Sequence, residues 1–231
     1  MKHHSGLWST CLLATVLAAG GLCAAENYQA SLQAGDAQRQ SQHPDAALTE
    51  YEAALGQAAT DTERALAMGK KGYVLAFDRK DYPAARALVL QALALENTAP
   101  VAQVTALQVM AECQMKADKN YAAATTTLEK AGQLAGVDWA QPMIALSLGD
   151  CRRFAGQFDQ AMASYQRIVD MPDADATIKA IAHLNQGLTW QYDRQDFAKA
   201  KLAYAAALAL KPDLKAEVDG HLARMSATAN P

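Results

Sequence analysis

The residues that could carry redox or metal chemistry are few and lie far apart in the sequence. Cys113 and Cys151 offer thiols, which act as nucleophiles when a neighbouring group lowers their pKa. His43, His183 and His221 each lack another His or Cys three or four residues away, which is the spacing of common metal sites. We therefore predict no catalytic residue, no metal site and no cofactor-binding residue, and we expect a protein that is not an enzyme.

Other chemical motifs give the same answer. The chain has no glycine-rich phosphate loop, no HExxH and no Gly-x-Ser-x-Gly. The carboxylates of the stretch Pro172–Asp175 are typical of a helix start rather than of an acid/base pair. With 21 basic and 24 acidic residues, the formal net charge is −3, which argues against nucleic acid as a partner.

The first 25 residues have the order of a secretory signal. A short basic start, MKHH, precedes an apolar stretch that ends with small residues at Ala25. We predict cleavage after Ala25 and a periplasmic or secreted mature protein. An uncleaved membrane anchor and a lipid on Cys23 are alternatives, although the apolar stretch is short for a span and Leu22 does not fit a lipoprotein signal.

The elements that position the remaining side chains follow from an internal repeat. The stretch Phe77–Leu95 resembles Tyr192–Leu210, and aromatic anchors recur at intervals of 39, 37 and 39 residues. Alanine comes three residues after each anchor and a larger residue comes four residues later, so both lie on one helical face. The anchors are Tyr82, Tyr121, Phe158 and Phe197, with Pro44 in a weaker first copy.

A small residue precedes each anchor by 9 or 10 positions. Glycine inside a helix costs about 1 kcal/mol relative to alanine, so its recurrence indicates close helix packing. We expect this residue to face the alanine of the second helix in its copy. Asp or Asn before an anchor, and the spacing of Thr60 and Glu63, predict helix caps. The small residues are Gly35, Gly72, Ala111, Gly149 and Gly187.

This pattern resembles the tetratricopeptide repeat (TPR), a pair of antiparallel helices, in an exported bacterial form. The period here is longer than the usual ~34 residues of that family. The resemblance predicts an all-α solenoid of about five helical hairpins plus a C-terminal capping helix. The predicted elements are a signal peptide 1–25, repeats 27–58, 60–97, 100–135, 138–171 and 174–211, a capping helix 212–226 and a flexible tail 227–231.

The resemblance also predicts a partner-binding surface on the first helices. Residues one, four and five after each small residue would face a concave groove that mixes charge with aromatic rings. Such aromatic and arginine side chains carry binding hot spots, although aromatics at helix ends also pack against the adjoining turn. The candidate residues are Arg39, Tyr73, Phe77, Lys116, Arg153, Phe154, Gln191 and Tyr192.

The two cysteines outside the predicted signal peptide occupy equivalent positions in neighbouring repeats. Packed helix axes lie ~8–10 Å apart, whereas a disulfide needs Cα atoms ~4.4–6.8 Å apart. We expect two buried thiols, with a disulfide between Cys113 and Cys151 as the alternative that an even count in an oxidising compartment suggests.

Together these features predict a non-enzymatic scaffold of the bacterial cell envelope that binds a protein or an extended peptide. An accessory or assembly component of an outer-membrane export or adsorption system is one alternative. A structural spacer without a ligand is a second. A redox or thiol enzyme that uses Cys113 or Cys151 is a third, and no neighbouring cysteine in sequence would resolve its disulfide.

Overall fold

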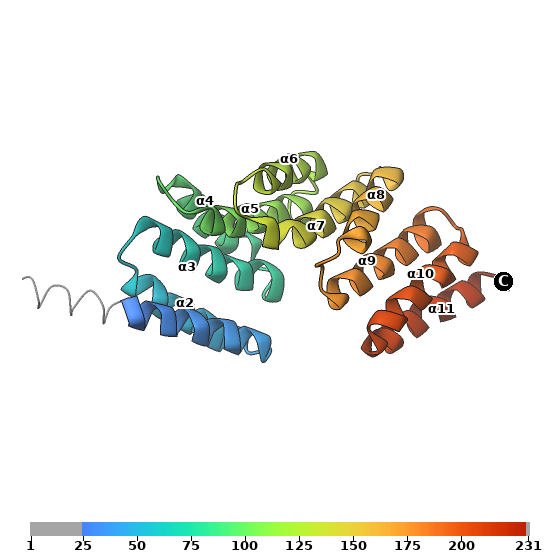
Figure 1. Ribbon diagram of the computed structural model, residues 1–231, viewed down its shortest axis with the longest axis horizontal. Coiled ribbons are helices and arrows are strands. Elements are labelled where there is room, and N and C mark those ends of the chain that lie inside the picture. The colour runs from blue at the N-terminus through green and yellow to red at the C-terminus, as the bar shows by residue number, and fades with distance from the viewer. Residues whose placement is uncertain (1–24, 230–231) are drawn as a thin grey trace, which may run out of the picture. The chain divides into compact units, whose positions relative to one another are not determined.

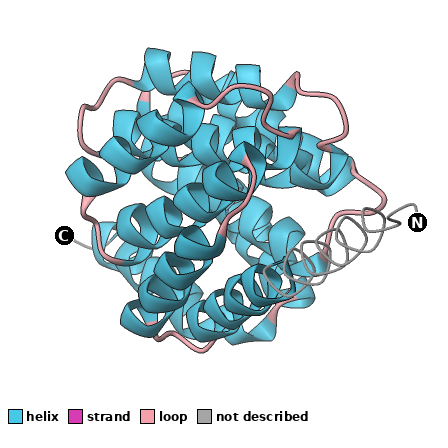
Figure 2. Ribbon diagram, turned by 90° about the vertical axis from the view of Figure 1, so that its left-hand side faces the viewer, coloured by secondary structure: helices cyan, strands magenta, loops and turns pink. Residues whose placement is uncertain are grey.

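A computed structural model describes residues 25–229 of the chain, so residues 1–24 of the predicted signal peptide and residues 230–231 lie outside the described part. The described residues form helices joined by short loops, without a strand among them (Figure 2). None of these helices is long and apolar enough to cross a membrane. The chain divides into two compact units, unit 1 up to Cys113 and unit 2 from Gln114.

Unit 1 is built from helix pairs that follow one another along the chain (Figure 1). Its last helix, α5, is shared, because the boundary between the units falls three residues before the end of that helix. In chain order the elements are a helix over residues 25–40, α2 (Pro44–Gln57), α3 (Asp61–Tyr73), the π-helical turn η1 (Val74–Asp78), α4 (Tyr82–Ala94) and α5 (Pro100–Lys116).

Unit 2 continues the same alternation and ends with a single helix. In chain order its elements are the end of α5, α6 (Tyr121–Gly132), the 3-10 turn η2 (Asp138–Ala140), α7 (Gln141–Phe154), α8 (Phe158–Asp170), α9 (Ala176–Leu188), the π-helical turn η3 (Thr189–Asp193), α10 (Phe197–Leu210), the 3-10 turn η4 (Pro212–Leu214) and α11 (Lys215–Ala229). The described residues thus contain the five helical hairpins and the final helix that the repeat predicted. α11 extends to Ala229, into the segment predicted as a flexible tail.

The helix starts use the predicted caps. The Thr60 side chain accepts from the Glu63 backbone, and the Glu63 carboxylate accepts from the Thr60 backbone, which completes a capping box. Asp81, Asn120 and Asp196 cap α4, α6 and α10 by accepting a backbone N–H three residues ahead. These caps fix the first residue of the second helix in the second, third and fifth pairs, whereas His43 and Gln157 before α2 and α8 make no side-chain cap bond.

The joint between two paired helices has two forms, which explains the variable spacing of the repeat. In the shorter joints, His43 N donates to Gln38 O and Gln157 N donates to Arg152 O, five residues back. In the longer joints the donor reaches six residues back, as Asp196 N does to Trp190 O. The extra residue is absorbed by the π-helical turns η1 and η3 in the second and fifth pairs.

The packing of the recurring glycines corrects the predicted helix contact. The glycines do not chiefly face the alanines of the second helix; they face the larger residue four positions further on. A Cβ added at Gly149 would lie 2.3 Å from Tyr165 Cε1, and a Cβ at Gly35 would lie 2.5 Å from Tyr51 Cε1. Sequence spacing identified the right helical face, but the long tyrosine ring reaches the glycine while the short alanine methyl does not.

The terminal helix α11 covers the apolar side of the last pair. Val218 and Met225 are buried with Leu184 and Tyr204, while Leu214 and Leu222 pack at the edge of this cluster. This confirms the predicted capping helix, which removes from water the face that a further repeat would otherwise cover.

Candidate functional site

Three of the predicted binding residues come together in unit 1. The guanidinium carbon of Arg39 lies 4.1 Å from the centre of the Tyr73 ring, and the Tyr73 and Phe77 rings are stacked with their centres 4.1 Å apart. Both rings also pack against the core of unit 1 and are only partly exposed. Arg39 Nε donates to Asp78 Oδ2 at 3.3 Å, so the stack is tied to the turn that follows α3.

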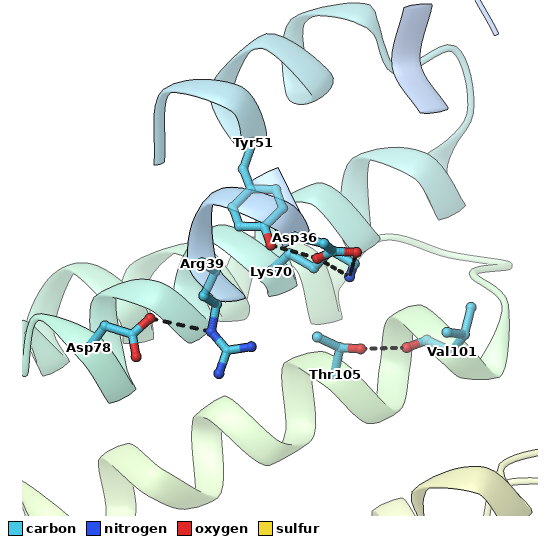
Figure 3. Close-up of polar contacts among 7 residues, drawn as sticks. All are labelled: Asp36, Arg39, Tyr51, Lys70, Asp78, Val101 and Thr105. Carbon is cyan, nitrogen blue, oxygen red and sulfur yellow. Dashed lines mark hydrogen bonds and ion pairs between the residues drawn. The ribbon is translucent and has the colours of Figure 1, made fainter. Parts of the chain in front are cut away.

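A second polar group in unit 1 centres on Asp36. This residue directly follows Gly35, so it is at one of the positions predicted to face the groove. Tyr51 Oη donates to Asp36 Oδ1 at 2.6 Å. Lys70 Nζ donates to both carboxylate oxygens, at 2.7 and 2.8 Å. Figure 3 shows Tyr51 and Lys70 converging on Asp36 from different helices, while Arg39 points toward Asp78. The negative charge of Asp36 is therefore compensated within unit 1 by the ammonium of Lys70.

Unit 2 repeats both groups about 114 residues further along. Arg153 Nε donates to Asp193 Oδ2 at 2.5 Å, in the same relation as Arg39 to Asp78. Tyr165 Oη donates to Asp150 Oδ1 at 2.7 Å, in the same relation as Tyr51 to Asp36. The two units thus share one polar framework between consecutive helix pairs.

The two units differ at one position of this framework. The counterpart of Lys70, two residues before the glycine of the next pair, is Asn185. Asn185 Nδ2 donates to Asp150 Oδ1 at 2.9 Å, so the amide takes the place of the ammonium without its charge. Burial raises the pKa of the Asp150 carboxyl, and the Tyr165 hydrogen bond and the charges of Lys116 and Arg153 oppose that shift only in part.

Phe154 is an exposed aromatic side chain at the end of α7. It is 47% exposed, although its ring stacks on Tyr121 with the centres 5.9 Å apart. Lys116 Nζ lies 4.9 Å from the ring centre and the Arg153 guanidinium carbon lies 5.8 Å from it. We call these four residues, Lys116, Tyr121, Arg153 and Phe154, the Phe154 surface. Three predicted binding residues therefore belong to one surface of unit 2.

Tyr192 lies in the turn η3, beside a pocket of ≈ 370 Å³ that Gln191, Gln195, Phe197 and Arg224 also line. Its side chain is 44% exposed, and its hydroxyl lies 3.0 Å from His221 Nδ1 and accepts from Arg224. Burial and the neighbouring Arg224 charge lower the pKa of His221, which favours the neutral imidazole. The pocket therefore combines an apolar wall with a guanidinium and a phenol.

Gln191 has a different place from the predicted one. It is 4% exposed, its Oε1 accepts from Tyr204 Oη at 2.6 Å, and its Nε2 donates to the His221 carbonyl at 2.9 Å. Its amide links η3 to α10 and α11, and the residue also lines the pocket beside Tyr192.

The residues with potential covalent chemistry are built into the core. Cys113 and Cys151 are both buried, as predicted. Cys113 Sγ lies 3.6 Å from the Tyr82 carbonyl oxygen, and Cys151 Sγ lies 3.6 Å from Met115 Sδ. Between residues 25 and 229, no group of three or more His, Cys, Asp or Glu side chains could hold a metal ion.

Sequence reasoning missed Asp78, Asp193, Tyr165 and Asn185 as parts of the framework. A signal was present, because Asp78–Asp81 and Asp193–Asp196 both lie within the repeated stretches. The repeat predicts a cap at the Asp before each anchor but no role for the first Asp. The first Asp pairs with the arginine of the preceding pair, and the Arg that follows it binds Asp45 in unit 1 and Asp159 in unit 2. Only the last Asp is the helix cap.

Comparison with solved structures identifies a TPR-like fold. A crystal structure of MamA matches with a TM-score of 0.53 and 20% identity over 79% of this chain and 96% of that one. YrrB, described as a TPR protein with an unusual peptide-binding site, matches with a TM-score of 0.51 and 19% identity over 84% of this chain and 90% of that one. A second MamA structure matches with a TM-score of 0.50 and 20% identity over 84% and 96%. A scan against models of protein families and a search of curated proteins gave no match.

Proposed function

We propose that the protein binds a partner protein or peptide through the Phe154 surface of unit 2, and that it acts as a non-enzymatic scaffold. The observation that carries this proposal is the setting of Phe154, which is 47% exposed while the Tyr121 ring and the cations of Lys116 and Arg153 lie 5.9, 4.9 and 5.8 Å from its ring centre. The side chain is thus ordered at the surface instead of being withdrawn into the core.

An ordered, exposed aromatic ring is well suited to binding. Covering apolar surface releases about 25 cal/mol per Å² removed from water. A ring that is already stacked loses little rotamer freedom when a partner arrives, so less of that gain is offset by ordering. Aromatic and arginine side chains dominate measured binding hot spots. The Arg153–Asp193 ion pair joins this surface to the turn that carries Tyr192, which is 44% exposed.

The class of partner follows from the same surface and from the fold. The peptide-binding site described for YrrB, whose fold is similar, supports a peptide segment as the bound species. In unit 1 the rings of Tyr73 and Phe77 are only partly exposed and pack against the core, so unit 2 offers the better-exposed aromatic surface.

We further propose that the protein works in the bacterial cell envelope after export. The support is the order of the first 25 residues, a basic start, an apolar stretch and small residues before Ala25. Mass measurement of the protein isolated from an envelope fraction tests this. The expected mass is that of a chain beginning at Glu26, and a chain that retains Met1–Ala25 in the cytoplasm would contradict it.

A displayed library of random peptides tests the binding proposal. Peptides selected on the wild-type protein are expected to bind Phe154→Ala at least ~10-fold more weakly, as for a hot-spot residue. The matched control is Leu202→Ala, which removes a 71% exposed apolar side chain from α10. Equal binding by wild type and a folded Phe154→Ala variant, or failure to select any peptide, would contradict the proposal.

A further inference from the structure

We propose that unit 2 binds a basic side chain of its partner, a lysine or an arginine, at the carboxylate of Asp150, beside the apolar contact made by Phe154. This inference rests on the proposed binding function and names the chemistry that the site selects. It begins from the difference between two equivalent positions in the two units.

Unit 1 shows what the carboxylate of this framework accepts. Asp36 receives a hydroxyl from Tyr51 and, on both oxygens, the ammonium of Lys70 at 2.7 and 2.8 Å (Figure 3). The ammonium is supplied by the first helix of the next pair. The internal lysine demonstrates that a primary ammonium fits between consecutive pairs at this position.

Unit 2 keeps the carboxylate and the hydroxyl but lacks the internal cation. Tyr165 Oη and Asn185 Nδ2 both donate to Asp150 Oδ1, at 2.7 and 2.9 Å. Oδ2 accepts no hydrogen bond from residues 25–229, and it is not sealed from solvent. One oxygen is therefore held in place by the protein, while the other keeps some contact with solvent and is the one that a ligand would reach.

The electrostatics of the site indicate that the Asp150 carboxylate lacks a compensating positive charge. A carboxylate that is partly removed from water is stabilised by a bound cation, and without one its pKa rises. The pKa of Asp150 is raised by burial despite the hydrogen bond from Tyr165. A lysine or arginine from a partner would give Asp150 the positive charge that Lys70 gives to Asp36.

Neither of the nearby cations of unit 2 binds Asp150 as Lys70 binds Asp36. Arg153 is paired with Asp193, and Lys116 lies over the Phe154 ring. Neither forms an ion pair with Asp150 in the described part of the chain. Arg39 occupies the position of Arg153 in unit 1, where Lys70 still binds Asp36. An arginine at this position is therefore compatible with an ammonium on the carboxylate.

The position of Asp150 relative to Phe154 gives the spacing of the ligand. The two residues are four apart on α7 and therefore lie on the same helical face, with Cβ atoms about 5–6 Å apart. An extended chain advances about 3.3 Å per residue and alternates its side chains. A basic residue and an apolar residue two positions apart in the partner point to the same side, about 7 Å apart, which is close to this spacing.

The proposal is tested with short synthetic peptides blocked at both ends, each carrying one apolar residue two positions from a variable residue. The variable residue is lysine, arginine, glutamine or glutamate, so that only a side-chain cation distinguishes the peptides. Binding to the full chain is measured by fluorescence anisotropy. The lysine and arginine peptides are expected to bind at least ~10-fold more tightly than the glutamine peptide, as for a charge-assisted contact.

Two substitutions test whether the preference for a basic residue arises at Asp150. Asp150→Asn keeps the shape and the acceptor oxygen and should abolish the preference for a basic residue. Asn185→Lys reproduces the arrangement of Lys70 and should also abolish it, because the protein then supplies its own cation. Lys71→Asn is the matched control in unit 1, because it removes a lysine that pairs with Glu52 and leaves the Lys70–Asp36 pair in place, so it should leave the preference unchanged. In wild type the preference should weaken as the pH falls and Asp150 becomes protonated, with Tyr165, Asn185, Lys116 and Arg153 as the groups that face it.

The outcomes separate this inference from the binding function on which it rests. Peptides that bind through Phe154 with equal affinity for lysine and glutamine would overturn the Asp150 site while the binding function stands. A preference for a basic residue that survives in folded Asp150→Asn would also overturn it. Failure of every peptide to bind would overturn both.

Discussion

The ring of Tyr165 occupies the space that a side chain at Gly149 would need. A Cβ at this glycine would lie 2.3 Å from Cε1 and 2.7 Å from Cδ1 of a tyrosine that is fully buried. The same relation holds between Gly187 and Tyr204, where the shortest distance is 2.4 Å. The Tyr165 hydroxyl then reaches Asp150 on the first helix, and the Tyr204 hydroxyl reaches Gln191 in the turn η3 that follows α9. The glycine therefore sets how closely the paired helices approach.

Replacing Gly149 by alanine is expected to destabilise the protein by about 1–3 kcal/mol, as for other overpacked cores. The added methyl group forces the Tyr165 ring to move, and the ring is enclosed on all sides. Urea denaturation of wild type and variant measures the loss. Helix propensity alone would favour alanine, so the predicted sign is opposite to that of an unconstrained helical glycine.

Gly220 provides that unconstrained case. It lies inside α11, and a Cβ added there meets nothing within 4 Å. Gly220→Ala should stabilise the protein by about 1 kcal/mol through helix propensity. If Gly149→Ala were as stabilising as Gly220→Ala, the tyrosine would not pack against Gly149.

The helix pairs could be predicted from sequence because their signals are local. Anchors, alanines and caps recur at fixed spacing, and each acts within its own helix or turn, as the capping box of Thr60 and Glu63 does. The choice of Tyr165 over Ala161 as the partner of Gly149 could not be predicted this way. Both residues lie on one face, and only side-chain length decides which of them reaches the glycine.

The polar framework was only partly predictable, because its members come from consecutive pairs. Arg153 was expected to face a groove, but its partner Asp193 lies 40 residues away. Gln191 is 4% exposed, and its amide bonds to Tyr204 and His221, which lie 13 and 30 residues further along. Pairing between residues so far apart in the chain leaves a weak trace in one sequence.

Asp150→Asn is expected to make the protein more stable at pH 7. The folded-state pKa of Asp150 is raised above its unfolded value, so the folded state holds its proton to higher pH than the unfolded state does. Stability due to this group is therefore greatest at low pH and is lost as the pH rises through the folded pKa. The advantage of the variant should shrink as the pH falls toward the unfolded pKa near 3.8 and then vanish.

Thermal unfolding of both proteins between pH 3 and pH 8 measures this difference. Asn185→Asp, which adds a second carboxyl at the same site, should have the opposite effect at neutral pH, since like charges oppose each other. A variant curve that runs parallel to wild type across the range would show that Asp150 has an ordinary pKa.

The two ion pairs that join the fourth and fifth helix pairs should differ in strength. The side chains of Arg153 and Asp193 are 16% and 22% exposed, whereas those of Arg194 and Asp159 are 36% and 94% exposed. A double-mutant cycle with Arg153→Met and Asp193→Asn should give a coupling of about 1 kcal/mol, and the Arg194–Asp159 cycle should give about 0.3 kcal/mol or less. Equal couplings in high salt and low salt would contradict an electrostatic origin.

Lys119→Gly is expected to stabilise unit 2. Lys119 lies in the turn before α6 with φ at 55°, in the left-handed region, where a residue other than glycine is disfavoured by about 1–2 kcal/mol. Glycine removes that cost but loses part of the gain through the entropy of the unfolded chain, so the net increase should be about 0.5–1 kcal/mol. Lys130→Gly, inside α6, is the matched control and should lower stability by about 1 kcal/mol. Urea denaturation measures both variants. A loss of stability at both positions would show that residue 119 does not adopt the left-handed turn. It would also show that the hydrogen bond from Asn120 N to Gln114 O, six residues back, does not close this joint.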